Sequence, residues 1–135
     1  MAFTTTPPYP QVLNSQITEV LAAGANTPVT VFTAGANGSI LSDVIVSTDD
    51  TAAQTIQILI KDGAVSYVYG QMILPIGSGT VNGSPPVNLM TTLPICQDEY
   101  GNKVLSLKAS QIVQFNVLSA TAGKKFHIFA QGRDF

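Results

Sequence analysis

Apolar and polar residues alternate with a period of two through most of this chain of 135 residues. The alternation is clearest in Ile40–Ser47, Thr55–Ile60 and Val113–Leu118, where valine, isoleucine or phenylalanine stands at every second position except Ser42. Successive side chains of a β-strand point to opposite faces of a sheet. Each of these segments therefore predicts a strand with one face on a core and the other toward solvent.

A tight turn is predicted at Lys61-Asp62-Gly63, between two runs that are rich in β-formers. Asp-Gly tolerates positive φ in a type I′ hairpin, so 53–60 and 64–73 should pair antiparallel. Turn residues recur between the other runs at the spacing of roughly 8 to 12 residues that is typical of sandwiches and barrels. We expect an all-β fold, an antiparallel β-sandwich of jelly-roll type with about eight strands; a small closed β-barrel is the alternative.

The first residues have a different composition from the rest. Residues 1–13 hold Pro7, Pro8 and Pro10, which fix φ and remove backbone donors, so this segment predicts an extended arm that precedes a sandwich domain of residues 14–135. The following segment, 11–23, fits either a helix with Val12, Ile17, Val20 and Leu21 on one face or a strand, and we favour the strand for part of it. This start lacks the basic and apolar regions of a secretory signal.

Charge is scarce. Asp, Glu, Lys and Arg make up 10% of the chain, whereas a soluble domain has about 25%. Six Lys and Arg residues are too few to neutralise the phosphates on which nucleic-acid binding depends or to hold an anionic membrane, so neither partner is expected. Cys96 is the single cysteine, which excludes an intrachain disulfide.

No catalytic, cofactor or metal site is predicted, and the chain is not expected to be an enzyme. His127 is the single histidine and has no partner His or Cys for a metal site. The sequence contains no Gly-x-Ser-x-Gly elbow and no Gly-x-Gly-x-x-Gly loop. Asp49-Asp50 and Asp98-Glu99 lack EF-hand spacing and are interpreted as turn caps. A hydrolase remains a minor alternative, and it would need His127 beside a serine and an acid.

Two features could mediate binding. Tyr67, Tyr69 and Tyr100 would form a sugar-stacking strip if they shared an exposed surface, so a carbohydrate-binding module is one alternative.

Assembly with other copies is the preferred interpretation, because a surface with few charges costs little to desolvate. The candidate interface residues belong to the arm and to the Gly/Ser/Pro-rich loop between Pro75 and Pro86. They are Phe3, Pro7, Pro8, Tyr9, Gly77, Ser78, Gly79, Pro85 and Pro86.

A family resemblance supports this interpretation. The segment DDTAAQTIQILIKDG at 49–63, Leu74-Pro75-Ile76-Gly77-Ser78-Gly79, Leu93-Pro94 and the ending 126–135 together resemble small structural proteins of tailed bacteriophages. They look most like the β-sandwich decoration, or cement, proteins of phage heads.

The resemblance implies a non-enzymatic homo-oligomer, with a trimer among the candidate states, that is made in the host cytoplasm. Such a protein binds the major capsid protein on the outside of the virion and stabilises contacts between capsomers. A tail or baseplate subunit is the alternative within the same class.

Overall fold

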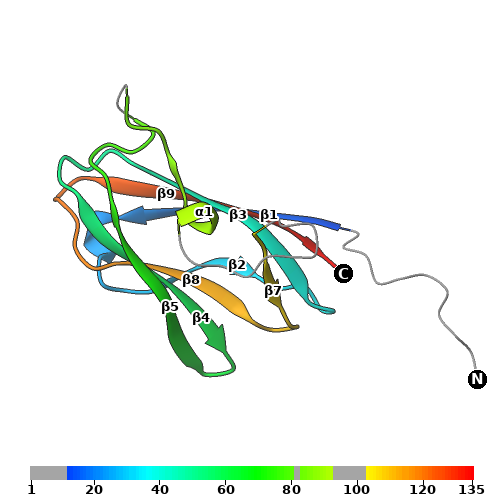
Figure 1. Ribbon diagram of the computed structural model, residues 1–135. Coiled ribbons are helices and arrows are strands. Elements are labelled where there is room, and N and C mark those ends of the chain that lie inside the picture. The colour runs from blue at the N-terminus through cyan, green and yellow to red at the C-terminus, as the bar shows by residue number, and fades with distance from the viewer. Residues whose placement is uncertain (1–11, 81–82, 93–102) are drawn as a thin grey trace, which may run out of the picture.

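The computed structural model describes residues 12–80, 83–92 and 103–135, which form two antiparallel sheets packed face to face (Figure 1). Sheet A contains β1 (Val12–Leu21), β9 (Lys125–Asp134), β3 (Ser39–Thr48) and β6 (Val87–Asn88), in that order, and β7 (Leu105–Leu107) also pairs with β3. Sheet B contains β2 (Val29–Thr33), β8 (Ile112–Val117), β4 (Gln54–Asp62) and β5 (Val65–Leu74). Two short helical segments are η1 (Ala22–Gly24) and α1 (Leu89–Thr92).

The strand pairs are nested. β4 pairs with β5, β3 with β6 and β7, β2 with β8, and β1 with β9. Two further pairings, β3 with β9 and β4 with β8, join these hairpins into the two sheets. A long hairpin wound in this way is the jelly-roll arrangement. The sandwich prediction is confirmed, and the sheets do not close into the barrel that was the alternative.

The predicted hairpin is present, but its turn differs from the prediction. Asp62 pairs with Val65, so Gly63 and Ala64 are the two central residues of the turn. Gly63 has a φ of 63°, whereas Ala64 has no positive φ. A positive φ at the first central position alone corresponds to type II′, in which glycine occupies that position. The prediction of type I′ was therefore wrong.

β1 settles the ambiguous segment as a strand. All ten of its residues pair with β9, from Val12 opposite Asp134 to Leu21 opposite Lys125. The backbone of β1 therefore hydrogen-bonds to the backbone of β9, whereas a helix would form its backbone hydrogen bonds within the segment itself. β1 begins at Val12, so Val12 and Leu13, which the sequence assigned to the arm, lie in the described sheet.

The core lies between the inner faces of the two sheets. Phe32 and Phe115 from sheet B and Phe126 from sheet A are fully buried. The rings of Phe115 and Phe126 meet across the interface with centroids 6.5 Å apart and planes tilted by 50°. Burial of each side chain of this size stabilises the fold by about 1.5–3 kcal/mol.

Gly132 allows β9 to approach β3 where the register shifts between Leu41 and Asp43. A Cβ at position 132 would lie 2.3 Å from the carbonyl oxygen of Ile40, which is closer than any contact can be. Glycine is used in strands where another backbone approaches closely. The requirement for glycine here therefore comes from the pairing of β3 with β9.

Among the described residues, no helix is long and apolar enough to span a membrane.

Candidate interaction surfaces

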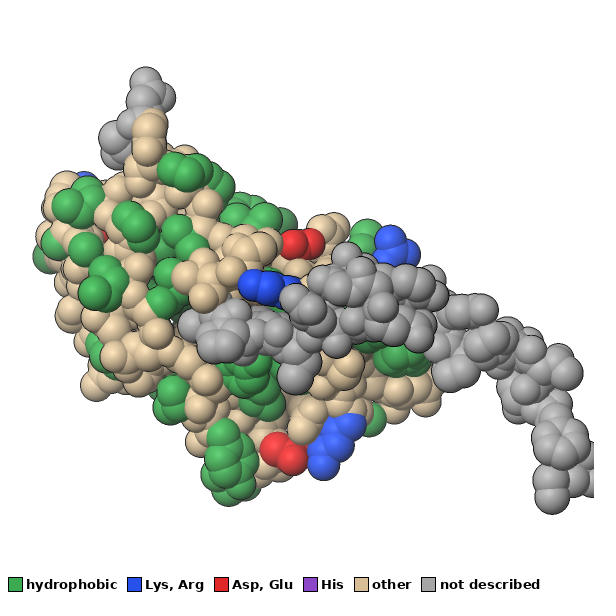
Figure 2. All heavy atoms as spheres, in the orientation of Figure 1, with side chains coloured by type: hydrophobic (Ala, Val, Ile, Leu, Met, Phe, Trp, Pro, Cys, Tyr) green, Lys and Arg blue, Asp and Glu red, His purple; other side chains and the backbone are tan. Residues whose placement is uncertain are grey.

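Exposed apolar side chains occur on two separate surfaces. Figure 2 shows green apolar side chains on one side of the molecule, with few red or blue charged groups between them. We define the sheet A outer face by Leu13, Ile17, Leu21, Ile45 and Phe129. We define the β5 edge by Val65, Tyr67, Val68 and Ile73. Apolar side chains that are exposed together on one surface are candidate contacts for a partner.

The sheet A outer face is organised by strand register. Ile17, Phe129 and Ile45 lie directly opposite one another on β1, β9 and β3. Ile17 is 73% exposed and Phe129 is 41% exposed. Residues opposite one another in neighbouring antiparallel strands have Cβ atoms about 4.5–5.5 Å apart. The three side chains therefore form an apolar row across three strands.

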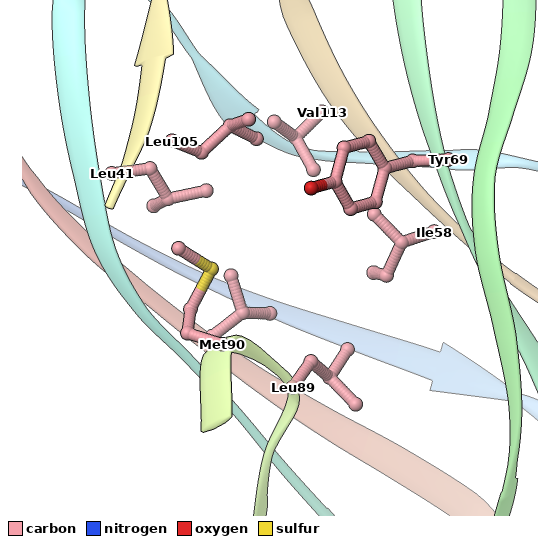
Figure 3. Close-up of a pocket in the computed structure, with 8 residues that line it drawn as sticks. Leu41, Ile58, Tyr69, Leu89, Met90, Leu105 and Val113 are labelled. Carbon is pink, nitrogen blue, oxygen red and sulfur yellow. The ribbon is translucent and has the colours of Figure 1, made fainter. Parts of the chain in front are cut away.

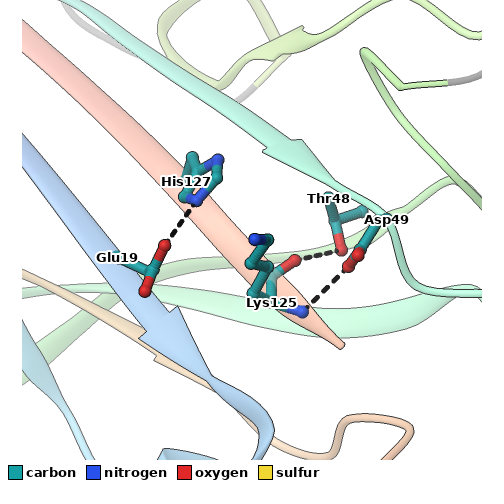
Figure 4. A network of polar contacts seen from close by, with 5 residues as sticks. All are labelled: Glu19, Thr48, Asp49, Lys125 and His127. Atoms are coloured by element: carbon teal, nitrogen blue, oxygen red, sulfur yellow. Dashed lines mark hydrogen bonds and ion pairs between the residues drawn. The ribbon is translucent and has the colours of Figure 1, made fainter. Parts of the chain in front are cut away.

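The next row along the same face is polar. Glu19 and Ser47 lie on either side of His127 in the register. Oε2 of Glu19 lies 2.8 Å from Nε2 of His127, and both side chains are substantially exposed (Figure 4). An acid, an imidazole and a hydroxyl therefore share this row, as the hydrolase alternative requires. Because the imidazole bonds to Glu19 on an open sheet face, the geometry is that of a cross-strand pair on the surface.

At the same end of sheet A, side chains at and just after the end of β3 bond to the backbone of β9. The Thr48 hydroxyl donates to the carbonyl oxygen of Lys125 at 2.9 Å, and the Lys125 amide donates to Oδ1 of Asp49 at 2.9 Å (Figure 4). These bonds fix the strand ends beside the row that contains His127.

Asp50 connects three loops at this end of the sandwich. Its carboxylate is buried and accepts hydrogen bonds from the Thr121 hydroxyl at 2.6 Å, the Thr121 amide at 3.0 Å, the Ala52 amide at 2.9 Å and Nε2 of Gln54 at 3.1 Å. Desolvation raises the pKa of Asp50, but these hydrogen bonds, led by those from Thr121, outweigh it and hold the pKa below the usual value. The residue serves as the turn cap that the sequence predicted.

Asp49 and Asp50 do not join a wider cluster of ligands. Within residues 12–80, 83–92 and 103–135, no group of three or more His, Cys, Asp or Glu residues could hold a metal ion. Asp98, Glu99 and Cys96 lie outside the described residues.

The loop after β5 folds back on the end of β3. The Thr48 amide donates to the Ser78 carbonyl at 2.9 Å, and the Gly77 amide donates to the Asp50 carbonyl at 3.0 Å. Gly77 and Ser78 are buried, whereas Gly79, Pro85 and Pro86 are exposed. A partner that reached this loop would therefore meet Gly79 and the two prolines. Gly79 has a φ of 81°, and a Cβ there would lie 2.9 Å from Cβ of Ser47.

The base of the predicted arm is tied to the C-terminal strand. Nδ2 of Asn14 donates to Oδ1 of Asp134 at 2.9 Å, and the Ser39 hydroxyl donates to the same oxygen at 2.5 Å. The Ser39 and Asn14 bonds hold the pKa of Asp134 below its usual value. The arm contacts predicted from the sequence, Phe3, Pro7, Pro8 and Tyr9, lie outside the described residues.

A small apolar pocket lies between the sheets, lined mainly by aliphatic side chains (Figure 3). Tyr69 turns into it, because Ile58 pairs with Gly70 while Leu59 pairs with Val68, which leaves Tyr69 as a bulge. The cavity measures about 10 Å³, close to the minimum for one water molecule. It is too small for a ligand. Of the two described tyrosines in the predicted sugar-stacking strip, Tyr67 is exposed and Tyr69 points into the pocket, whereas Tyr100 lies outside the described residues.

Sequence reasoning missed both apolar surfaces. Ile17 and Phe129 lie 112 positions apart in the chain, at positions 17 and 129, and only the β1–β9 pairing makes them neighbours. The β5 edge did carry a signal, because Val65–Leu74 contains no charged residue. An uncharged strand can be central or peripheral, however, and its position in the sheet is decided by the topology.

No protein-family model matches the chain, and no curated protein matches it. Among solved structures, the chain is similar to a pentameric capsid protein isolated from metagenomic phage sequences, with 16% sequence identity and a TM-score of 0.39. The match covers 98% of this chain, which spans 65% of the length of that protein. The function therefore has to be inferred from the residues of this chain.

Proposed function

We propose that this protein is a structural component of a bacteriophage virion, a decoration protein that attaches to the outside of the assembled head and stabilises contacts between capsomers. The observation that carries the proposal is the presence of two exposed apolar surfaces, the sheet A outer face and the β5 edge, on a sandwich with few charges. The cores of protein interfaces are similarly poor in charged residues. The resemblance of residues 49–63 and 74–79 to phage decoration proteins supports the choice of a phage capsid as the partner.

The exposed residues supply the driving force for such attachment. Covering a side chain such as Ile17 or Phe129 contributes about 1.5–3 kcal/mol. Glu19, two residues from Ile17 on the same face of β1, is already engaged with His127. A partner can therefore cover the apolar row while this carboxylate keeps its contact, which limits the desolvation cost.

The arm and the loop are proposed as further contacts. An arm that leaves the body at Val12 can reach a neighbouring subunit, because eleven extended residues span at most about 36–40 Å. Phe3, Pro7, Pro8 and Tyr9 would contact that neighbour, and Gly79, Pro85 and Pro86 would form a second contact at the other end of the sandwich. Many copies on one shell would convert weak single contacts into stable attachment. The partners are the major capsid protein and other copies of this chain.

Immunogold labelling of purified virions tests the proposal. An antibody against this chain would be applied to intact particles of the phage that encodes it, with particles from a gene deletion as the control. Label distributed over the outside of the head is the expected result. Label confined to tails would replace decoration with the tail or baseplate alternative, and unlabelled particles would remove the virion role.

A further inference from the structure

Among the described strands, β5 lies at one edge of sheet B. It pairs with β4 on one side, and it is the last strand in the order β2-β8-β4-β5. An edge strand presents a row of unpaired backbone N–H and C=O groups, which can template pairing with another chain. At ten residues, β5 is longer than the usual strand of about 5–6 residues.

The usual protections of an edge are weak on β5. Val65–Leu74 contains no proline and no charged residue, although lysine and proline are the common means of blocking edge pairing. The opposite edge of sheet B is different, because β2 has only five residues, follows Pro28 and shifts register between Thr30 and Phe32. The irregularity in β5 itself is the bulge at Tyr69.

Side chains on both faces of β5 are exposed and apolar. Tyr67, opposite Ile60, is 59% exposed, and Val68, opposite Leu59, is 58% exposed. Ile73 near the other end of the strand is 66% exposed. A strand added beside β5 would therefore cover apolar groups on both faces in addition to pairing the backbone.

We propose that the β5 edge is a self-association site, at which two copies of this chain pair their β5 strands antiparallel across a two-fold axis. Each copy then contributes the same uncharged edge, with apolar side chains exposed on both faces. A two-fold contact is self-complementary by symmetry. The charges near the hairpin turn are Lys61, opposite Ser66, and Asp62, opposite Val65, and Oδ2 of Asp62 is paired with Nζ of Lys108 at 3.3 Å.

The contact is small and the dimer should be weak. Pairing of one strand from each copy buries less than the roughly 1,200–2,000 Å² of a stable interface. We therefore expect reversible dimerisation at micromolar to millimolar concentration. This inference rests on the edge of sheet B and does not depend on the virion role, so immunolabelling of particles and dimerisation in solution can fail separately.

Sedimentation equilibrium of the full chain and of two matched variants tests the site. Val68→Lys places a charge on β5, whereas Val12→Lys places the same charge at a residue that is equally exposed, at 60%, on β1. We expect Val68→Lys to raise the dimer dissociation constant at least about tenfold and Val12→Lys to leave it unchanged. Ile73→Lys provides a second β5 variant if Val68→Lys folds poorly, as judged by circular dichroism.

Amide hydrogen exchange at low and high protein concentration identifies the pairing itself. Protection of amides in Val65–Leu74 should increase with concentration, and the β5 lysine variants should abolish the increase. A chain that stays monomeric at every concentration would overturn the proposal, as would a dimer that persists in both β5 variants. Deletion of residues 1–11 tests whether the arm, and not a second β5, pairs with this edge. Loss of the dimer in that variant would mean that the arm occupies the edge and would overturn the proposal.

Discussion

The Asp50 carboxylate accepts two hydrogen bonds from Thr121, one from its hydroxyl at 2.6 Å and one from its amide at 3.0 Å. This contact joins the loop after β3 to the loop after β8, which lie 71 residues apart in the chain. The loop after β5 is attached to the same residue through the Asp50 carbonyl. One end of the sandwich is thus built around a single buried acid.

Replacement of Asp50 by alanine should destabilise the protein. The substitution leaves the Thr121, Ala52 and Gln54 donors without their acceptor. Gln54 is buried and Thr121 is half-buried, and an unsatisfied buried group costs about 1–3 kcal/mol. We expect a loss of about 3 kcal/mol in the free energy of unfolding, measured by urea denaturation. Asp49→Ala is the matched control, because Asp49 accepts one hydrogen bond near the surface, and it should cost about 1 kcal/mol or less. Equal losses in the two variants would contradict the role given to Asp50.

Stability should decrease in acid through Asp50 and Asp134. Both carboxyls have pKa values that are lowered in the folded protein, so each binds its proton more weakly than in the unfolded chain, where the pKa is about 3.9. Their stabilising contribution is complete above that unfolded value and is lost as the pH falls through the folded pKa values. Denaturation at a series of pH values should show Asp134→Asn losing less stability than the wild type below about pH 4. Parallel pH profiles would refute this assignment.

His127 should be dispensable. Its contact with Glu19 is an exposed pair, and such pairs contribute about 0–1 kcal/mol. His127→Ala should therefore unfold within about 1 kcal/mol of the wild type and retain attachment to phage heads. A hydrolytic activity that disappears in this variant would support the hydrolase alternative instead.

The arm should matter for attachment and not for folding. Because β1 begins at Val12, a chain that lacks residues 1–11 should keep the melting temperature of the full protein while binding heads more weakly. Deletion of residues 1–16 is the contrasting variant, since it removes half of the β1–β9 pairing and should lower the melting temperature. Head binding by the shorter deletion at full strength would exclude the arm as a contact.

Local pattern was sufficient to predict much of the fold. The alternation in Thr55–Ile60 and Val113–Leu118 reflects a buried face, and these segments became β4 and β8. Lys61-Asp62-Gly63 marked the hairpin, although the turn type depended on which residue took the first central position. For 11–23 the helical and strand periods overlap, and the choice was made by pairing with β9, which is distant in sequence.

The candidate surfaces were less accessible to sequence reasoning. Asp49 and Asp50 are adjacent and chemically identical, yet of the two only Asp50 is buried. Its hydrogen-bond partner Thr121 lies in the β8–β9 connection, which is distant in sequence. Ser78 looked like an exposed loop residue and is buried by its contacts with the end of β3. The exposure of β5 likewise follows from strand order. Each of these features is set by long-range contacts that residue periodicity does not encode.

Binding to heads that lack this protein tests the decoration role most directly. Purified chain would be added to DNA-filled heads from a gene deletion, and the bound protein and the temperature of DNA release would be measured. We predict saturable binding to the outer surface and a higher release temperature, with Ile17→Lys on the sheet A outer face weakening both. Heads that bind no added protein, or that release DNA at an unchanged temperature when saturated, would contradict the account.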